Sequence, residues 1–198
     1  MSQADDKQHL DAIRRGDRNR LEPLLRAHQN RLYALCLRIL GNPEDAAEAA
    51  QDALIQIIQK LDTFQGRAAL ATWMSRIAIN RAISLLRRRK SRPATYLSDL
   101  TAPDQPDYPL IDHREPSPDQ RVQDQEEAQQ LAAALQTLEE RYRVALVLRD
   151  IEGMSYDEIA EITGLALGTV KSRIFRARLA LRQAIDDANL PSKETARG

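Results

Sequence analysis

The chain carries a single cysteine among its 198 residues, which excludes a disulfide bond within it. This residue, Cys36, lies on the apolar face of a helical pattern, so we expect a buried thiol rather than a reactive one. No apolar run approaches the length that spans a membrane, and the N-terminus is too polar for a secretory signal. These absences predict a soluble, intracellular protein.

Patterns typical of enzyme active sites are also missing. The three histidines, His9, His28 and His113, are scattered and lack metal-ligand spacing. We find no pairing of a nucleophile with a base, and no glycine-rich loop of the kind that cradles phosphates. The sequence therefore predicts no catalytic residue, no metal and no cofactor, and a nucleic-acid enzyme is the least favoured class of function.

Acidic residues are absent from residues 63–98, although the whole chain is neutral, with 29 basic and 29 acidic residues. Positive charge is therefore concentrated locally instead of being spread over the surface. Residues 66–90 contain no proline and are rich in Ala, Leu, Ile and Arg, which predicts a helix. The basic residues of the stretch are Arg67, Arg76, Arg81, Arg87, Arg88, Arg89, Lys90 and Arg92.

A helical projection divides the side chains of this basic helix into two stripes. One stripe is suited to a core, and the other combines an aromatic ring, cations and an amide. Proteins hold unpaired nucleic acid with such a combination, because a ring can stack on a base and an amide can read its edge. The alternative is that Trp73 belongs to the core and the arginines form a solvated helix face. The core stripe is Ser75, Ile79, Ala82, Ile83 and Leu86; the second is Trp73, Arg76, Asn80, Ser84 and Arg87.

Three more helices are predicted ahead of the basic helix, over residues 1–15, 19–40 and 43–62. Leu10 and Ile13 are expected to face inward from the first of them. Gly41 is expected to end the second, Asn42 to cap the third, and Pro43 to be its first residue. Residues 1–92 thus form an all-α domain.

The third predicted helix has an apolar face and an acidic face. An acidic face is commonly just solvated surface, but it also suits docking of a basic partner helix. Ile55 is expected to be exposed at its margin. The inward positions are Ala47, Ala50, Leu54, Ile57, Ile58 and Leu61, and the acidic side comprises Glu44, Asp45, Glu48, Gln51, Asp52 and Gln56.

Prolines and acids dominate residues 93–124, which we interpret as a flexible linker. It is either a spacer kept soluble by its charge or a polyanionic strand that occupies a cationic nucleic-acid channel. Its prolines are Pro93, Pro103, Pro106, Pro109, Pro116 and Pro118, and its acids are Asp99, Asp104, Asp107, Asp112, Glu115, Asp119 and Asp124.

Residues 125–187 form a second helical domain, followed by a tail over residues 188–198. Two helices are predicted first, with Leu131, Leu135 and Leu138 on the inner face of one and Ala145, Leu146 and Leu148 on that of the other. Ser155 and Glu158 then form a capping box, and the helix that they open ends at Gly164. A last helix begins near Leu167 and packs through Val170, Ile174, Ala177 and Leu181.

The last two helices have the spacing of a helix-turn-helix. Any amphipathic helical hairpin could mimic this spacing, but residues 166–184 contain no acid, which favours DNA reading. Arg and Lys suit guanine edges and phosphates, Ser and Thr suit several bases, and a Phe can touch a thymine methyl group. The outer face carries Thr169, Lys171, Ser172, Phe175 and Arg176, flanked by Arg173 and Arg178.

The chain combines a domain suited to unpaired bases, an acidic linker and a domain suited to duplex DNA. In this combination it resembles the extracytoplasmic-function (ECF) sigma factors of bacterial RNA polymerase. The resemblance covers nearly the whole chain. Its residues are Gly16-Asp17, the Leu40-Gly41-Asn42-Pro43-Glu44-Asp45-Ala46 join, Gln51-Asp52, Phe64, Thr72-Trp73-Met74 and Ile77-Ala78-Ile79-Asn80. The C-terminal residues are Gly153-Met154-Ser155-Tyr156-Asp157-Glu158-Ile159-Ala160 and, most specifically, Gly168-Thr169-Val170-Lys171-Ser172-Arg173-Ile174-Phe175-Arg176-Ala177-Arg178.

The resemblance implies a cytoplasmic initiation factor without enzymatic activity, which binds core RNA polymerase and promoter DNA. Asp45, Glu48, Gln51, Asp52 and Ile55 would grip the coiled coil of the largest polymerase subunit, and the second domain would meet its flap. Phe64, Arg67, Trp73, Arg76, Asn80 and Arg87 would capture the −10 strand. Thr169, Lys171, Ser172, Arg173, Phe175 and Arg176 would read the −35 duplex. The linker would thread the active-site cleft, and an anti-sigma factor, often membrane-bound in this group, would hold the protein inactive.

The chain departs from the family pattern at Ala166, where Pro is common, at Asp52, where Glu is usual, and at His28, where Tyr is common. None of these departures touches the expected base readers. The alternative class is a stand-alone helix-turn-helix regulator that binds duplex DNA and never binds polymerase. That class accounts for residues 155–182 and assigns no role to the basic stripe or to the acidic helix.

Overall fold

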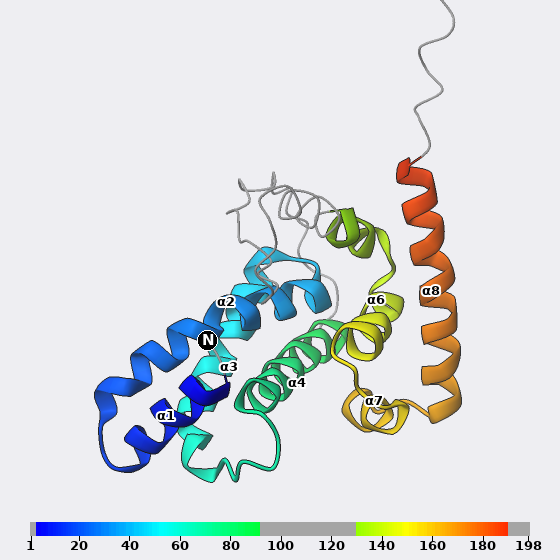
Figure 1. Ribbon diagram of the computed structural model, residues 1–198. Helices are drawn as coiled ribbons and strands as arrows, with labels where there is room; N and C mark the ends of the chain where they lie inside the picture. The colour runs from blue at the N-terminus through cyan, green and yellow to red at the C-terminus, as the bar shows by residue number, and fades with distance from the viewer. Residues whose placement is uncertain (1–2, 92–129, 190–198) are drawn as a thin grey trace, which may run out of the picture. The chain divides into compact units, whose positions relative to one another are not determined.

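The computed structural model describes residues 3–91 and 130–189, which contain helices and turns and no strand (Figure 1). The chain divides into two compact units, Met1–Tyr108 and Pro109–Gly198. The all-α, two-domain prediction is therefore confirmed. The linker expected over residues 93–124 lies outside the described residues, as does most of the tail.

Within residues 3–91, the N-terminal unit contains four α-helices and two short 3₁₀ helices. Helices α2, α3 and α4 pack against one another, and α1 packs on α2. The predicted boundaries differ most for α4, which begins at Leu70 instead of residue 66. The elements are α1 (Gln3–Arg14), η1 (Arg18–Arg20), α2 (Leu21–Leu40), α3 (Pro43–Lys60), η2 (Leu61–Thr63) and α4 (Leu70–Ser91).

The join between α2 and α3 is built as predicted from its local sequence. Gly41 ends α2, and its N–H donates to Leu37 O at 2.8 Å. The Asn42 side chain accepts from the N–H groups of Glu44 at 2.8 Å and Asp45 at 3.1 Å, which caps α3. Cap and turn together satisfy helix-end groups that would otherwise lack partners.

The core of this unit includes Leu24, Leu35 and Ile39 of α2, which are fully buried. Cys36 lies among them, and burial raises the pKa of its thiol to about 12. The prediction of a buried, unreactive cysteine is thus confirmed, because the nucleophilic thiolate is strongly disfavoured.

The buried face of α3 differs from the predicted one. Ala47 and Ile58 are exposed and Leu54 is only partly buried, whereas these positions were expected in the core. Because α3 packs on both α2 and α4, small side chains that let helices approach closely occupy the contact. The buried residues of α3 are Ala46, Ala49, Ala50, Ala53 and Ile57.

The C-terminal unit contains a helical segment over residues 130–137, then α6 (Glu140–Leu146), the π-helical turn η3 (Val147–Ile151), α7 (Tyr156–Thr163) and α8 (Leu167–Asn189). Helix α8 packs against α6 and α7. Leu135, Leu138, Val170, Ile174 and Ala177 are buried as predicted. Leu131, expected inside, is 39% exposed, and Leu181 is only partly buried.

Candidate nucleic-acid interfaces

The two predicted stripes of α4 lie where the sequence pattern puts them. All five expected core residues, from Ser75 to Leu86, are buried. On the other side Arg76, Asn80, Ser84 and Arg87 are exposed, and Trp73 is partly buried at the head of the row. We call these five residues the α4 stripe. The structure therefore brings a ring, an amide and two guanidinium groups onto one face.

Trp73 is held in place by a second aromatic ring. The ring centroids of Phe64 and Trp73 are 5.3 Å apart, with the planes tilted by 49°. Phe64 is only 7% exposed, so its ring supports Trp73 and is not itself presented to solvent. Trp73 is thus partly a core residue, as one interpretation of the sequence held, and partly an exposed residue of the α4 stripe, as the other held.

A short loop joins Phe64 to the start of α4. Residues 65–68, including Arg67, are exposed, and Gly66 adopts a left-handed backbone with φ +72°. Side chains with a Cβ disfavour that conformation, so glycine permits the turn that starts α4 at Leu70. The loop base is contacted by Arg14, whose Nη2 donates to the carbonyl of Phe64. No pattern in the sequence indicated this contact across 50 residues.

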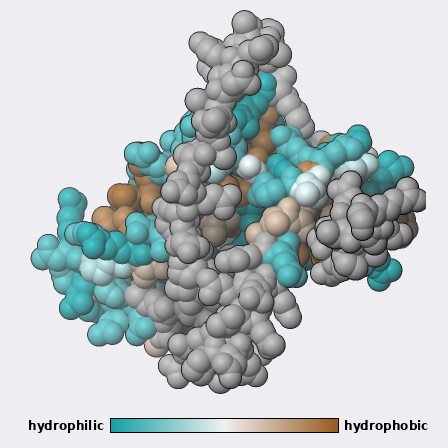
Figure 2. Space-filling view, turned by 90° about the horizontal axis from the view of Figure 1, so that it is seen from above, coloured by the Kyte–Doolittle hydropathy of each residue, from teal (hydrophilic) through white to brown (hydrophobic). Residues whose placement is uncertain are grey.

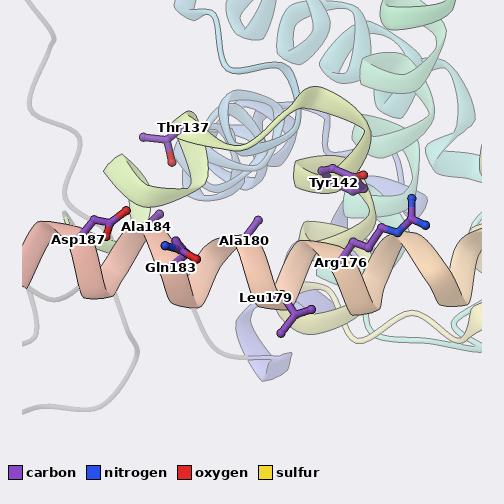
Figure 3. A pocket seen from close by; sticks show the side chains of 8 residues that line it. All are labelled: Thr137, Tyr142, Arg176, Leu179, Ala180, Gln183, Ala184 and Asp187. Atoms are coloured by element: carbon purple, nitrogen blue, oxygen red, sulfur yellow. The ribbon is translucent and has the colours of Figure 1, made fainter.

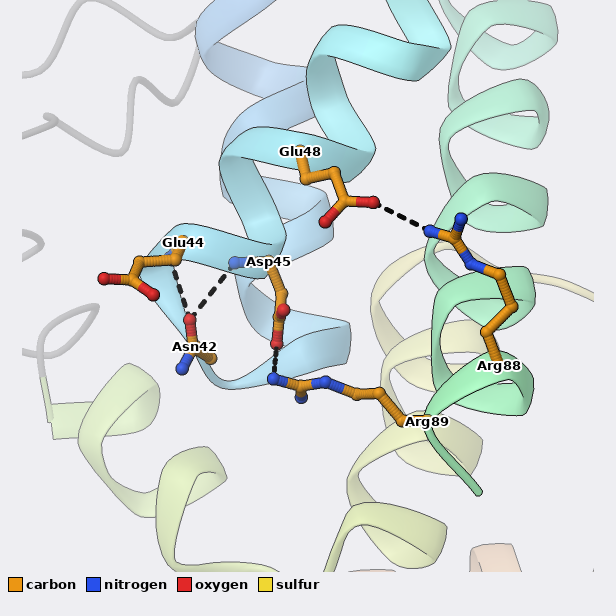
Figure 4. Close-up of polar contacts among 6 residues, drawn as sticks. All are labelled: Asn42, Glu44, Asp45, Glu48, Arg88 and Arg89. Carbon is orange, nitrogen blue, oxygen red and sulfur yellow. Dashed lines mark hydrogen bonds and ion pairs between the residues drawn. The ribbon is translucent and has the colours of Figure 1, made fainter. Parts of the chain in front are cut away.

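The acidic side of α3 is in direct contact with basic residues of α4 (Figure 4). Asp45 forms an ion pair with Arg89, and Arg88 Nη2 lies 2.7 Å from Glu48 Oε1. Arg81 donates to Gln56 at 2.9 Å. Part of the acidic face is therefore neutralised within the unit, and these basic residues of α4 have a structural role beside any role in binding.

Asp45 is an enclosed member of that face, with its side chain 14% exposed. Burial raises the pKa of its carboxyl group, and the positive charge of Arg89 opposes that rise. Elsewhere on this side of α3, Glu48 and Gln51 are exposed, Asp52 is partly buried, and Ile55 and Ile58 are 48% and 45% exposed.

The helix-turn-helix starts with the predicted capping box. Ser155 Oγ accepts from the Glu158 N–H at 3.2 Å, and the Glu158 carboxylate accepts from the Ser155 N–H at 2.9 Å. Gly164 then ends α7 with φ 70°. The carbonyl of Ala166 accepts from the N–H groups of Thr169 and Val170 at 2.9 and 3.1 Å, so the turn forms although Ala replaces the Pro common in the family.

The outer face of α8 is open over its N-terminal half. Lys171, Ser172, Phe175 and Arg176 are exposed, with Phe175 at 65%. Thr169 and Arg173 are partly buried at its margins. All six predicted readers thus lie on or beside one surface, which we call the α8 face.

Two arginines fix the helix-turn-helix to the preceding π-helical turn. Arg178 makes two hydrogen bonds to the Asp150 carboxylate, at 2.9 and 2.5 Å, and they hold the pKa of Asp150 below its usual value. Arg149 donates to Met154 O at 2.7 Å, and its guanidinium lies 4.7 Å from the centroid of the Tyr156 ring. Arg178, which the sequence placed beside the reading face, is therefore a structural clamp.

Two grooves lie beside α8 within this unit. The larger, of about 660 Å³, lies between α8 and the residues that precede and open α6 (Figure 3). It is lined by Thr137, Tyr142, Arg176, Leu179, Ala180, Gln183, Ala184 and Asp187. The second, of about 430 Å³, is lined by apolar residues such as Leu131, Leu146 and Ile185, with the Asp150–Arg178 pair at its edge.

Exposed large apolar side chains occur on α3, on α8 and on the segment before α6. In the view of Figure 2 the hydrophobic patches are interrupted by hydrophilic surface. The exposed large apolar residues are Ile55, Ile58, Leu131, Leu167, Phe175 and Leu179.

Within residues 3–91 and 130–189, no cluster of His, Cys, Asp and Glu could hold a metal ion, and no helix is long and apolar enough to span a membrane.

Comparison with known families matches both units. Residues 24–92 match the model of sigma-70 region 2, and residues 128–181 match that of sigma-70 region 4. The α4 stripe falls within the first match and the α8 face within the second. A chain with these two regions is a sigma factor, the class of subunit that directs bacterial RNA polymerase to promoters.

Relatives that align along nearly the whole chain show which group of sigma factors it belongs to. The sequence is 36% identical to the RNA polymerase sigma-H factor of Pseudomonas aeruginosa, over 93% of this chain and 96% of the relative. It is 33% identical to the ECF RNA polymerase sigma-E factor of Escherichia coli (90% and 93%) and 32% identical to the ECF sigma factor SigW of Bacillus subtilis (91% and 97%). The chain belongs to the ECF sigma factors, and its function is promoter-directed initiation of transcription.

A solved structure shares the fold. It is the sigma factor RpoE in complex with the anti-sigma factor NepR from Bartonella quintana, with a TM-score of 0.52 and 27% sequence identity. The alignment covers 83% of this chain and 96% of that chain.

Proposed function

We propose that the two exposed surfaces divide promoter recognition between them. The α4 stripe, with the loop over residues 64–69, captures unpaired bases of the −10 element, and the α8 face reads the −35 element as duplex. The observation that carries this proposal is the α4 stripe itself, a row of exposed polar groups headed by a braced tryptophan. A duplex-binding regulator has no use for such a row.

Stacking is the main attraction that the α4 stripe offers to a base that has left the helix. Stacking on an aromatic ring contributes roughly 1–3 kcal/mol per base. The exposed guanidinium groups of Arg67, Arg76 and Arg87 suit the phosphates of the same strand, and Asn80 suits a base edge. The buried Phe64 takes part by holding Trp73.

For polymerase binding, we propose the open part of the acidic face of α3. Glu48, Gln51, Asp52 and Ile55, with Asp45 at its enclosed end, suit the basic coiled coil of the largest subunit. We add Ile58 because its exposure continues the apolar surface of Ile55 by one helical turn. An apolar pair rimmed by polar groups is the usual composition of a binding surface.

The proposal extends to the remaining segments of the chain. Residues 1–92 act as the polymerase-binding and −10 module, residues 93–124 as the linker, residues 125–187 as the −35 and flap-binding module, and residues 188–198 as a tail. We propose a cytoplasmic protein without enzymatic activity, since the polymerase supplies the chemistry. The RpoE–NepR complex supports control by an anti-sigma factor, which would cover the surfaces that polymerase uses.

Polymerase binding is tested by substituting Ile55→Lys in the full chain and measuring its affinity for core RNA polymerase. We expect a loss of about 2 kcal/mol or more, the size of a hot-spot truncation, because the substitution removes apolar contact and adds a charge like that of the partner. Gln29→Lys is the control, since it adds the same charge at an exposed position of α2.

Run-off transcription with the reconstituted holoenzyme on genomic promoter fragments tests initiation. Specific transcripts from the wild type, lost with Ile55→Lys and kept with Gln29→Lys, support the proposal. If the wild type fails to bind core polymerase while binding duplex DNA by itself, the proposal is wrong and a stand-alone regulator takes its place.

A further inference from the structure

Helix α1 lies before the matched region 2, which begins at residue 24, and none of the proposed contacts uses it. It is nevertheless firmly attached to α2. Leu10 is buried, and Asp6 lies 2.9 Å from His28 Nε2, with both residues at least 93% buried. A buried hydrogen-bonded pair fixes two helices relative to each other, because a shift would leave a buried polar group without its partner.

The anchored helix brings one side chain to the loop over residues 64–69. Arg14 is the last residue of α1, and the backbone closes directly after it, with Gly16 N–H donating to Ile13 O at 2.9 Å and Asp17 N–H to Ala12 O at 3.0 Å. From this position the Arg14 guanidinium donates to the carbonyl of Phe64. The contact joins the end of α1 to the residue at which the loop begins.

Phe64 is the fixed end of that loop. Its N–H donates to Leu61 O at 3.1 Å, its ring packs on Trp73, and its carbonyl accepts from Arg14. At the other end the carbonyl of Ala69 accepts from the Trp73 N–H at 3.1 Å. The ring of Trp73 thus contacts Phe64 at one end of the loop, and its backbone N–H bonds to Ala69 at the other. Arg14 donates to the Phe64 end.

We propose that Arg14 is a positioning residue for capture of the −10 strand, a role that rests on the proposed function of the α4 stripe. By holding the Phe64 carbonyl, Arg14 keeps the Phe64 ring against Trp73 and so presets the face on which a base stacks. A preset site binds more tightly because less conformational freedom is lost on binding. Arg14 does not need to touch DNA for this role.

The neighbouring residue allows the positioning role of Arg14 to be distinguished from a simple effect of its charge. Arg15 carries the same charge at the same end of α1, and its side chain is exposed. If Arg14 acts only by attracting the DNA backbone, Arg14→Ala and Arg15→Ala will weaken binding equally. If it acts through Phe64, only Arg14→Ala will do so, and Arg14→Lys will restore part of the binding because an ammonium group can also donate to a carbonyl.

The first measurement uses Trp73, which is the one tryptophan of the chain. In the free full-length protein, acrylamide quenching reports how accessible the indole is to solvent. We expect Arg14→Ala to raise the quenching constant and Arg15→Ala to leave it at the wild-type value. Equal quenching in all three proteins would overturn the proposal.

The second measurement uses holoenzyme reconstituted with core polymerase, and a fluorescent single-stranded oligonucleotide carrying the non-template −10 sequence of a promoter mapped by run-off. We expect Arg14→Ala to weaken binding about 10-fold, which corresponds to 1.4 kcal/mol. Affinity for core polymerase should stay unchanged. A loss of core affinity equal to the loss of strand affinity would mean general damage and would overturn the positioning role.

Trp73→Ala and Asn80→Ala in the same assay separate this inference from the function on which it rests. If both weaken strand binding while Arg14→Ala does not, the positioning role is wrong and the proposed function stands. If neither weakens it, the α4 stripe is not the strand-binding site, and the inference falls with it.

Discussion

Helices α4 and α8 both present cations to solvent, but over surfaces of different width. Buried residues border the α4 stripe closely, since Ile77 and Leu85 are at most 8% exposed although they lie next to it in sequence. In the first half of α8, by contrast, burial is confined to Val170, Ile174 and Ala177. The first helix thus offers a narrow row and the second a broad convex face.

The difference matches two states of DNA. A major groove about 12 Å wide admits a whole helix, so a duplex reader needs a broad face. An unpaired strand brings its bases to the protein one at a time, so a row of groups beside one fixed ring is enough. The width of the exposed surface therefore indicates whether a cationic helix enters a groove or lies along a strand.

Among variants of the α4 stripe, the largest expected effect on DNA binding is that of Trp73→Ala, because it removes the stacking surface and the partner of Phe64. We expect strand capture to weaken by roughly 1–3 kcal/mol. Binding to −35 duplex should not change. Fluorescence of 2-aminopurine in the −10 element measures opening, with Trp73→Phe as the control that keeps a ring. Equal loss of −35 binding would break the comparison between the two helices.

Arg176→Ala is expected to act on the other helix. Loss of a bidentate contact to a base should cost about 1–3 kcal/mol and relax specificity at one position of the −35 element. Competition among duplex variants measures this specificity. Arg182→Ala, which removes an exposed charge further along α8, is the control. Unchanged promoter preference in Arg176→Ala would remove this residue from the α8 face.

A smaller effect is expected for Asn80→Ala. Loss of one amide hydrogen bond should cost about 1 kcal/mol of strand binding. Ser84→Ala, one turn further along the same row, tests whether readout extends along the helix. Core polymerase affinity of each variant is measured in parallel, and an equal loss there would argue against base reading.

Asp150→Asn tests what holds the α8 face in place. The exposed pair with Arg178 should contribute about 0.2–1 kcal/mol to stability. Because Arg178 lowers the pKa of Asp150, this contribution is present above the usual Asp pKa and is lost as pH falls through the lowered value. Thermal melts should therefore show a constant difference from wild type between about pH 5 and 8. A difference that shrinks within that range would contradict the assignment.

The smallest effect on stability is expected for Asp45→Asn. Burial raises the pKa of Asp45, so keeping this carboxylate charged at neutral pH opposes folding, and the Arg89 ion pair offsets part of that cost. We expect a change within about 0.5 kcal/mol at neutral pH, together with weaker binding to core polymerase. Melting curves and core titration measure the two. A large destabilisation would show that the ion pair outweighs burial.

Local signals in the sequence were sufficient for much of the fold. The Asn42 cap, the Ser155–Glu158 capping box and the inner face of α4 each depend on residues a few positions apart, and all are confirmed. The membership of the α4 stripe followed from the same periodicity.

Features set by packing between distant segments were not predictable in this way. The inward face of α3 was wrong at Ala47 and Ile58, because the buried face depends on how α3 lies against both α2 and α4, which its own periodicity does not determine. The pairing of Arg178 with Asp150 and the reach of Arg14 to Phe64 depend on which segments meet in space. Arginine has the same appearance in the sequence whether it binds a carbonyl, a carboxylate or DNA.

Helix α8 is a single unbroken rod of 23 residues. Its first half carries the proposed DNA readers, and the α8 side of the unit's grooves is lined mainly by side chains further along, with Arg176 also lining the larger one. Inserting one residue between these halves would rotate one against the other by about 100° and displace it by about 1.5 Å. Substitutions on the outer face can thus alter promoter choice during evolution without disturbing the packed half. An insertion or deletion within the helix would instead turn the proposed DNA readers away from the major groove of the DNA.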